Sequence, residues 1–145
     1  MEFDDLYQKI VLDHYKHPRN FGEGLPGSTA VELDNPSCGD HIKLMVAVDE
    51  EGKIKDVKFS GSGCAISVAS ASIMTEEITG KSVKEAEAII NDVLDTMQGR
   101  KEPDELDKHG DLSALKGVIK FPVRVKCATL SWHAIQDALK LNKNK

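Results

Sequence analysis

The sequence has few cysteines and few aromatic residues, and it lacks a long apolar run. Only three of the 145 residues are cysteine, and aromatic residues make up 5%. An odd number of cysteines spread along a chain argues against a secreted fold held by disulfides, because disulfides pair thiols. No apolar run approaches the ~20 residues that span a membrane, and the chain begins with acidic residues where a secretory signal would be basic. We expect a cytoplasmic protein without membrane contacts.

A basic cluster is also absent. The formal net charge is -5, and the lysines are scattered, without aromatic residues between them. Nucleic acid is therefore not expected as the main ligand. The sequence contains no P-loop, no dinucleotide-binding glycine pattern and no Ser/His/Asp set. The chemistry of the chain has to be sought in its cysteines.

The hydrophobic pattern predicts one α+β domain over residues 1–145. Apolar residues at helical spacing predict a first helix that ends before Pro18. Alternating apolar residues then predict three strands, at 29–33, 42–48 and 57–59, in an antiparallel meander. Ile54 is out of phase with the third strand, which indicates a bulge or a late strand start.

Helices dominate the second half. We predict one from Cys64 to about Gly80, one that starts with a capping box at Ser82, and a last one after Pro122. The polar stretch at 100–120 has only two apolar anchors, Leu112 and Leu115, so it predicts a surface insertion with about one helical turn. Strands followed by helices are typical of an α+β fold, here a three-stranded antiparallel sheet with several helices packed on one face.

Cys38 has a carboxylate close by. Cys38 and Asp40 are separated by Gly39, which permits a tight turn, so both side chains can reach the same side. A thiolate and a carboxylate can both bind a borderline ion such as zinc. Taken alone this spacing is a weak signal, because an aspartate in a turn commonly caps the backbone.

The other two cysteines add to this signal. Cys64 follows two glycines and begins a predicted helix, where unpaired amides and the positive end of the dipole favour a thiolate. The other interpretation is a small buried hydrophobic residue. Cys127 is expected near the start of the last helix. Together these positions predict one metal site formed by Cys38, Asp40, Cys64 and Cys127.

The histidines are expected to lie outside this site. His133 is six positions after Cys127 and so points away from its sulfur on a helix. His41 projects away from Asp40 in an extended strand. The remaining three have no clustered partners in the sequence: His14, His17 and His109.

Four stretches of the chain match motifs of one known family, in the same order. They are residues 12–20 (LDHYKHPRN), 35–40 (NPSCGD), 61–72 (GSGCAIS with ASAS) and 124–132 (RVKCATLSW). The sequence resembles the IscU/NifU-type iron-sulfur cluster assembly proteins, and most closely the SufU branch. The resemblance covers almost the whole chain and implies the IscU/SufU-like fold.

The resemblance to the SufU branch rests on departures from the IscU scaffolds. Those scaffolds carry a histidine directly before the third cysteine, where this chain has Lys126, and a Leu-Pro-Pro-Val-Lys chaperone motif, where it has FPVR at 121–124. The stretch at 100–120 also looks like the insertion of the SufU-type proteins. The resemblance therefore implies a zinc-dependent sulfurtransferase that accepts sulfur from a SufS-type cysteine desulfurase.

The resemblance also implies roles for single residues. Zinc would be held by Cys38, Asp40, Cys64 and Cys127, and a histidine of the desulfurase would take one zinc position. This releases Cys38 to accept the persulfide sulfur, which then passes to downstream iron-sulfur assembly proteins. Arg124 either pairs with Asp40 or a partner carboxylate during ligand exchange, or is a surface arginine.

Two alternatives remain open. The same four residues can hold iron, so the chain can be a scaffold for a [2Fe-2S] cluster, although Lys126 argues against this. The site can also be a structural zinc module that docks a partner without catalysis.

Overall fold

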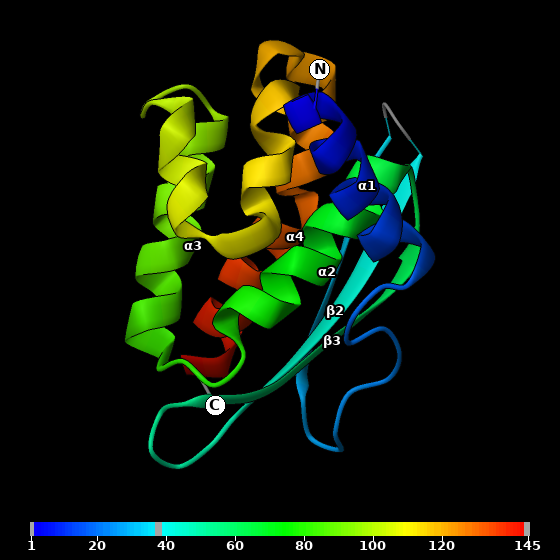
Figure 1. Cartoon of the computed structure of the whole chain (residues 1–145). Coiled ribbons are helices and arrows are strands. Elements are labelled where there is room, and N and C mark those ends of the chain that lie inside the picture. The colour runs from blue at the N-terminus through cyan, green and yellow to red at the C-terminus, as the bar shows by residue number, and fades with distance from the viewer. Residues whose placement is uncertain (1, 37–38, 144–145) are drawn as a thin grey trace.

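The computed structural model describes residues 2–36 and 39–143, with side chains from residue 6 onward. The chain begins with a helix, continues with three strands and ends with helices, as the hydrophobic pattern predicts (Figure 1). The elements are α1 Glu2–Lys16, β1 Thr29–Asn35, β2 Asp40–Val48, β3 Ile54–Ser62, α2 Ala65–Ile78, α3 Val83–Met97, the 3-10 helices η1 Pro103–Lys108 and η2 Gly110–Lys120, and α4 Pro122–Lys143. The predicted α+β class is confirmed.

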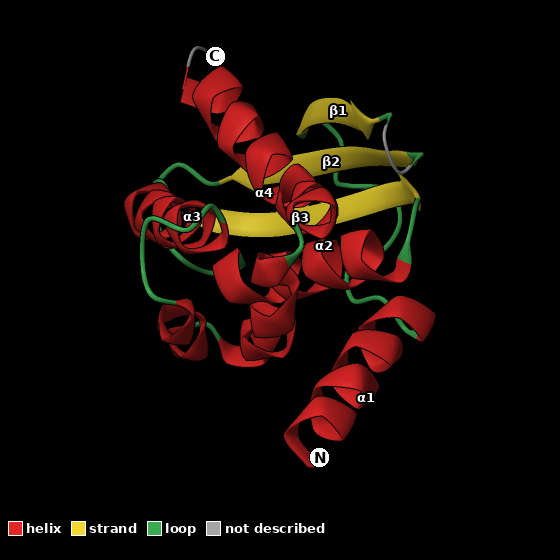
Figure 2. Ribbon diagram, turned by 90° about the horizontal axis from the view of Figure 1, so that it is seen from above, coloured by secondary structure: helices red, strands yellow, loops and turns green. Residues whose placement is uncertain are grey.

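The sheet is an antiparallel meander in the order β1-β2-β3. Helices gather on one of its faces (Figure 2), where α4 contacts β1 and β2 and α2 contacts β3. The residues of β2 on this face are fully buried, Ile42, Leu44 and Val46. Asp40 is the first residue of β2 and has the same parity, so its side chain also faces the helices.

A β-bulge explains why Ile54 is out of phase with the rest of β3, which is one of the two predicted causes. Val48 pairs with Ile54 but Ala47 pairs with Asp56, so the pairing register shifts by one residue. A bulge of this kind lets Ile54 and Val57 both face the core, and each is at most 1% exposed.

Small side chains bring α2 and α4 close together. Ala69, Ser70 and Ala71 of α2 are fully buried. Ser70 Oγ donates to the carbonyl of Ala128 at 2.5 Å and accepts from the indole nitrogen of Trp132 at 3.0 Å. Because both contacts of the hydroxyl go to α4, the two helices are tied together by hydrogen bonds as well as by packing.

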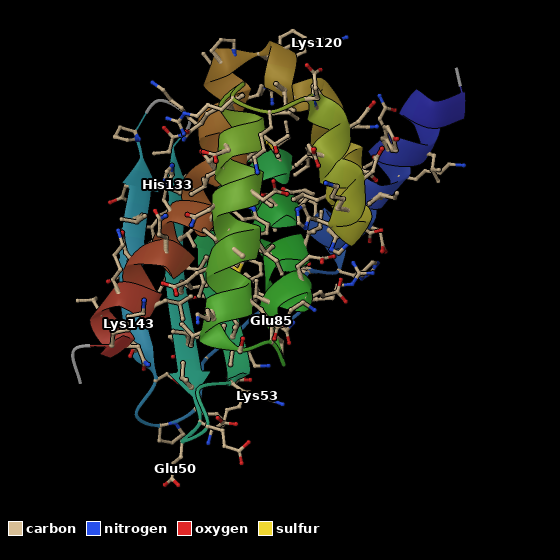
Figure 3. All side chains as sticks on the ribbon, turned by 90° about the vertical axis from the view of Figure 1, so that its left-hand side faces the viewer. Glu50, Lys53, Glu85, Lys120, His133 and Lys143 are labelled. Carbon is tan, nitrogen blue, oxygen red and sulfur yellow. The ribbon has the colours of Figure 1, made fainter. Side chains whose placement is uncertain are left out.

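The predicted capping box at α3 is present. Ser82 Oγ accepts from the amide of Glu85, and the Glu85 carboxylate accepts from the amide of Ser82. Figure 3 shows Glu85 at the beginning of α3 and Lys143 at the end of α4. Lys143 pairs with Glu87 at 2.7 Å, so the end of α4 is also fastened to the first turns of α3.

The segment 100–120 differs from its prediction. It contains two 3-10 helices, η1 and η2, in place of a single turn. The predicted anchors Leu112 and Leu115 are buried, and Leu106 is buried as well. These three leucines, together with His109, recur every three residues, which suits the three residues per turn of a 3-10 helix. The segment therefore packs into the hydrophobic core.

Among residues 2–36 and 39–143, none of the helices combines the length and the apolar character that crossing a membrane requires.

Candidate metal centre

Three of the four predicted ligands meet at one end of the sheet. Asp40 starts β2, Cys64 directly precedes α2, and Cys127 lies in α4; their ligand atoms are all within 4.8 Å of one another. This end is opposite the turn between β2 and β3, since Figure 3 shows Lys120, just before α4, at the far end from Glu50 and Lys53. The fourth predicted ligand, Cys38, lies outside the described residues.

Asp40 is held in place through both carboxylate oxygens. Its side chain is only 1% exposed. The backbone amide of Cys64 donates to Oδ1 at 2.9 Å, and the side-chain amide of Asn35 donates to Oδ2 at 3.3 Å. Burial of an ionised carboxylate is costly unless it is paired or hydrogen-bonded. These two donors therefore stabilise the charge and fix the direction of the carboxylate.

The glycines before Cys64 have a steric role. A Cβ on Gly63 would lie well inside 3.0 Å of Asp40 Oδ1, closer than real Cβ contacts come. Gly61 has a φ of +130° and a Cβ there would collide with the carbonyl of His41. Only glycine lets the chain pass this close to β2 and still deliver the Cys64 amide to Asp40.

Cys64 is the N-cap of α2, as the sequence predicts. Its Sγ accepts from the amide of Ser67 at 3.5 Å, and the residue is partly buried. The sulfur therefore lies at the positive end of the α2 dipole, next to the backbone amides of the first turn.

Cys127 is placed differently from its prediction. Because proline is well suited to the first position of a helix, α4 begins at Pro122 itself. Cys127 therefore lies in the second turn, at 1% exposure, and the helix-start amides do not act on it. Its Sγ is 3.8 Å from the amide nitrogen of Asn35, the same group that reaches Asp40.

Two residues that the sequence reasoning missed complete the surroundings. Asn35 bridges Asp40 and Cys127 from the last position of β1. Ser67 is buried one turn into α2, and its hydroxyl has no hydrogen-bond partner among the described residues. Asn35 begins the motif at 35–40, which is the only signal that singled it out.

The donor set fits a zinc ion. Two sulfurs and one carboxylate oxygen within 4.8 Å provide three ligands of the types that zinc prefers. Three groups that are anionic when they ligate, gathered in a mostly buried place, also need a cation to balance their charge. A further thiolate would complete a tetrahedral site.

Arg124 lies on the first turn of α4. It is exposed, and it forms no ion pair with any of the described residues. It lines a surface groove of about 680 Å³ together with Ile66 and two exposed apolar residues, Phe121 and Val123. Among the described residues it is not paired with Asp40, the partner predicted for it.

His41 and His133 lie outside the cluster of potential ligands, as predicted. His41 contacts Asp34 at 2.5 Å and Glu32 at 3.2 Å on the other face of the sheet. The hydrogen bonds to Asp34 and Glu32 raise the pKa of His41 above its usual value. Figure 3 shows His133 on α4, to one side of α3.

Comparison with known proteins gives consistent matches. A sequence model described as the NifU-like N terminal domain matches residues 6–145. The chain is 48% identical over 136 residues to the zinc-dependent sulfurtransferase SufU of Bacillus subtilis, which covers 94% of this chain and 90% of that protein. It is 44% identical over 143 residues to the iron-sulfur cluster assembly scaffold protein IscU of Streptococcus pyogenes, which covers 99% of this chain and 88% of that protein.

A solved structure is similar as well. The crystal structure of an iron-sulfur cluster assembly scaffold protein for the SUF system, from Fervidobacterium islandicum, has a TM-score of 0.77 and 34% sequence identity. The match covers 90% of this chain and 94% of that one. The fold is therefore shared along nearly the whole length.

Proposed function

Because the chain belongs to the family of the NifU-like N-terminal domain, we propose that it is a zinc-dependent sulfurtransferase of iron-sulfur cluster assembly. One zinc ion is held by Cys38, Asp40, Cys64 and Cys127. Cys38 accepts sulfur from a SufS-type cysteine desulfurase and passes it to downstream assembly proteins in the cytoplasm. Residues 1–145 act as one domain, with 100–120 as an insertion in it.

The convergence of Asp40, Cys64 and Cys127 is the observation that carries this proposal. The 48% identity to a zinc-dependent sulfurtransferase supports zinc over iron. Lys126 supports the same choice, because the histidine of the IscU scaffolds is replaced there. Bound zinc would keep the coordinated thiols deprotonated.

The transfer is a thiolate displacement. The Cys38 thiolate attacks the outer sulfur of the desulfurase persulfide, the sulfur-sulfur bond breaks, and the desulfurase cysteine leaves as a thiolate. Cys38 then carries the persulfide. In the sequence Cys38 directly precedes Gly39, whose φ is +70°, whereas Cys64 caps α2 and Cys127 lies within α4. These positions support Cys38 as the acceptor, with the other two cysteines retaining the metal.

Asp40 and Arg124 have supporting roles in this proposal. Asp40 would be one of the zinc ligands, and the Cys64 amide and the Asn35 side chain hold its carboxylate in place. Arg124 is exposed three residues before Cys127 and is free of ion pairs with the described residues. It is available to pair with Asp40 or with a partner carboxylate while the ligands exchange.

The decisive experiment mixes the protein with its cognate desulfurase and free cysteine. We expect a mass gain of about 32 Da, one sulfur atom, on the peptide that contains Cys38. Alanine release by the desulfurase should also accelerate. Cys38→Ser, which removes the accepting sulfur together with one proposed zinc ligand, should show neither effect. A wild-type protein that neither gains the mass nor accelerates alanine release would contradict the proposal.

A scaffold function is the second candidate, favoured by the 44% identity to a scaffold protein IscU. The same four residues would then hold Fe2+ or a [2Fe-2S] cluster. Anaerobic purification separates the two candidates. About one zinc per chain without a visible absorption band supports the sulfurtransferase, and a chromophore that moves to an apo-acceptor supports the scaffold.

A structural zinc module that only docks a partner is distinguished by Asp40→Ala. A sulfur acceptor should lose transfer activity and stay folded. A purely structural site should mainly lose thermal stability.

A further inference from the structure

A second group of ligand-type side chains lies where three helical elements meet. It consists of His14 in α1, Glu76 in α2 and Asp111 in η2, whose ligand atoms are all within 4.8 Å of one another. The expectation that His14 has no clustered partner is therefore wrong. The pattern was invisible in the sequence because Asp111 is 97 positions away from His14.

His14 is fixed like a metal-binding histidine. Its side chain is 1% exposed, and Nδ1 is 2.7 Å from the hydroxyl of Ser72. Ser72 Oγ also accepts the backbone amide of Arg19 at 2.9 Å. A hydroxyl oxygen has two lone pairs, so it can accept both N-H groups. In that arrangement the lone pair of Nε2 is free for a ligand, and the second nitrogen sets the ring orientation.

Both carboxylates approach this nitrogen. Nε2 lies 2.8 Å from Asp111 Oδ2 and 3.9 Å from Glu76 Oε1. Two carboxylate oxygens facing an imidazole nitrogen are held there either by a proton on Nε2, which then donates to Asp111, or by a metal ion. Ligands about 2.1 Å from a metal stand roughly 3.4 Å apart in a tetrahedral site. Relative to that spacing, the contact to Asp111 has to lengthen and the contact to Glu76 has to shorten, each by roughly half an ångström.

Exposure leaves room for this adjustment. The side chains of Glu76 and Asp111 are 48% and 52% exposed, so both can move and water can fill further coordination positions. This is the composition of an open site, with three protein ligands and solvent.

The surroundings are rich in carboxylates. The pKa of Glu77 is raised, mainly by burial. His109 and Lys81 lower this pKa, and the negative charges of Asp111 and Glu76 raise it. The side chain of Arg19 is a cation close to the carboxylates of Glu76 and Asp111. The Arg19 guanidinium is hydrogen-bonded to Asp13 at 2.5 Å, and that bond is the main cause of its raised pKa, with Glu76 and Asp111 contributing. Arg19 is therefore already paired with Asp13.

We infer that His14, Glu76 and Asp111 form a second metal site, for a divalent ion that accepts imidazole and carboxylate ligands, such as Mn2+ or Zn2+. It is distinct from the cysteine-containing site in both position and donor chemistry. Its ligands come from α1, α2 and η2, so an ion there links the first helix and the insertion to the core.

The test uses Mn2+, which prefers oxygen and imidazole ligands to thiolates. Substoichiometric Mn2+ is added to the zinc-loaded protein, and paramagnetic broadening of the backbone amide signals is followed by NMR. We expect selective broadening around His14, Glu76 and Asp111, reversed by excess Zn2+. Asp111→Asn and Glu76→Gln should each weaken Mn2+ binding about tenfold or more.

Asp137→Asn is the matched control, because it removes an exposed carboxylate on α4. It should leave the broadening unchanged. The replaced side chains are half exposed, so the variants should fold, and the same spectra verify this. Absence of binding, broadening spread over the acidic surface, or full binding by Asp111→Asn would each overturn the second site.

Discussion

The two groups of ligands differ in how strongly the backbone around them is constrained. Asp40 and Cys64 meet because glycine at position 63 lets two segments approach within steric limits that no other residue allows. His14, Glu76 and Asp111 come instead from the interiors or the first turn of helical elements. A backbone constraint can be recognised in the sequence because it requires a glycine. Side chains that project from regular helices require no particular neighbouring residue. This difference explains why only the first site is predictable, and each experiment below tests it.

The largest effect is expected from Gly63→Ala. The added Cβ collides with Asp40 Oδ1, so the carboxylate or the Cys64 amide has to move away. We expect zinc affinity to fall on the order of 100-fold, measured by competition with a chromophoric chelator.

Gly117→Ala is the control for this variant, because a Cβ at Gly117 meets no atom within 4 Å. It should keep its zinc affinity and gain roughly 0.4–1 kcal/mol of stability. Equal zinc affinity in both alanine variants would show that the close approach is unimportant.

Asn35→Ala should have the next largest effect. It removes the donor to Asp40 Oδ2 and the amide beside Cys127 Sγ. Loss of such an outer partner costs about tenfold in metal affinity. The same chelator competition measures it, with Asn91→Ala on the exposed side of α3 as the control. An unchanged zinc affinity would mean that the Cys64 amide alone is enough to orient the Asp40 carboxylate.

Asp92→Asn tests how the segment that carries Asp111 is attached to α3. Burial pushes the pKa of Asp92 upward, but hydrogen bonds from Lys101 and His109 outweigh it and lower the pKa below its usual value. His109 is followed by Gly110 and Asp111, so this pair fastens the start of η2 to α3. We expect a loss of roughly 1–2 kcal/mol in the free energy of unfolding at neutral pH.

The sign of the pH dependence follows from the lowered pKa. The folded state binds the Asp92 proton less readily than the unfolded state, so its stabilisation is present above the unfolded pKa. It is lost as the pH falls through the folded pKa. Urea unfolding of wild type and Asp92→Asn at several acidic pH values should show the difference shrinking. Asp95→Asn, at a more exposed ion pair with Arg100, is the control and should show a smaller difference throughout.

The smallest effect is expected from His41→Gln. Asp40 and His41 are neighbours in β2, but their side chains lie on opposite faces of the sheet, and His41 is bonded to Asp34 and Glu32. Zinc content by elemental analysis should therefore be unchanged. A drop in zinc would place His41 within the influence of the metal ligands and weaken the distinction between the two faces.

Much of the fold could be predicted because its signals are local. The bulge at Ile54, the capping box at Ser82 and the helix start at Cys64 each follow from neighbouring residues. The start of α4 differs from the prediction because Pro122 is itself the first residue of the helix. The 3-10 segment differs because its buried residues recur every three positions within a polar stretch, a weaker signal than the periods of an α-helix or a strand.

Parts of the metal centre were beyond sequence reasoning for a different reason. Asn35 and Ser67 carry no chemistry that singles them out, and their role depends on which chain atoms lie next to them in space. The same holds for the contact of His14 with Asp111.

The hydroxyl of Ser70 has a consequence for the metal centre. It binds both the Ala128 carbonyl and the Trp132 indole, directly after Cys127 along α4. The helices that bring Cys64 and Cys127 to the cluster are thus tied to each other by hydrogen bonds that involve neither sulfur. Asp40 comes from the sheet, and the Cys64 amide joins it to this pair of helices. The spacing of the two sulfurs is therefore set by the packing of α2 against α4, before any metal binds.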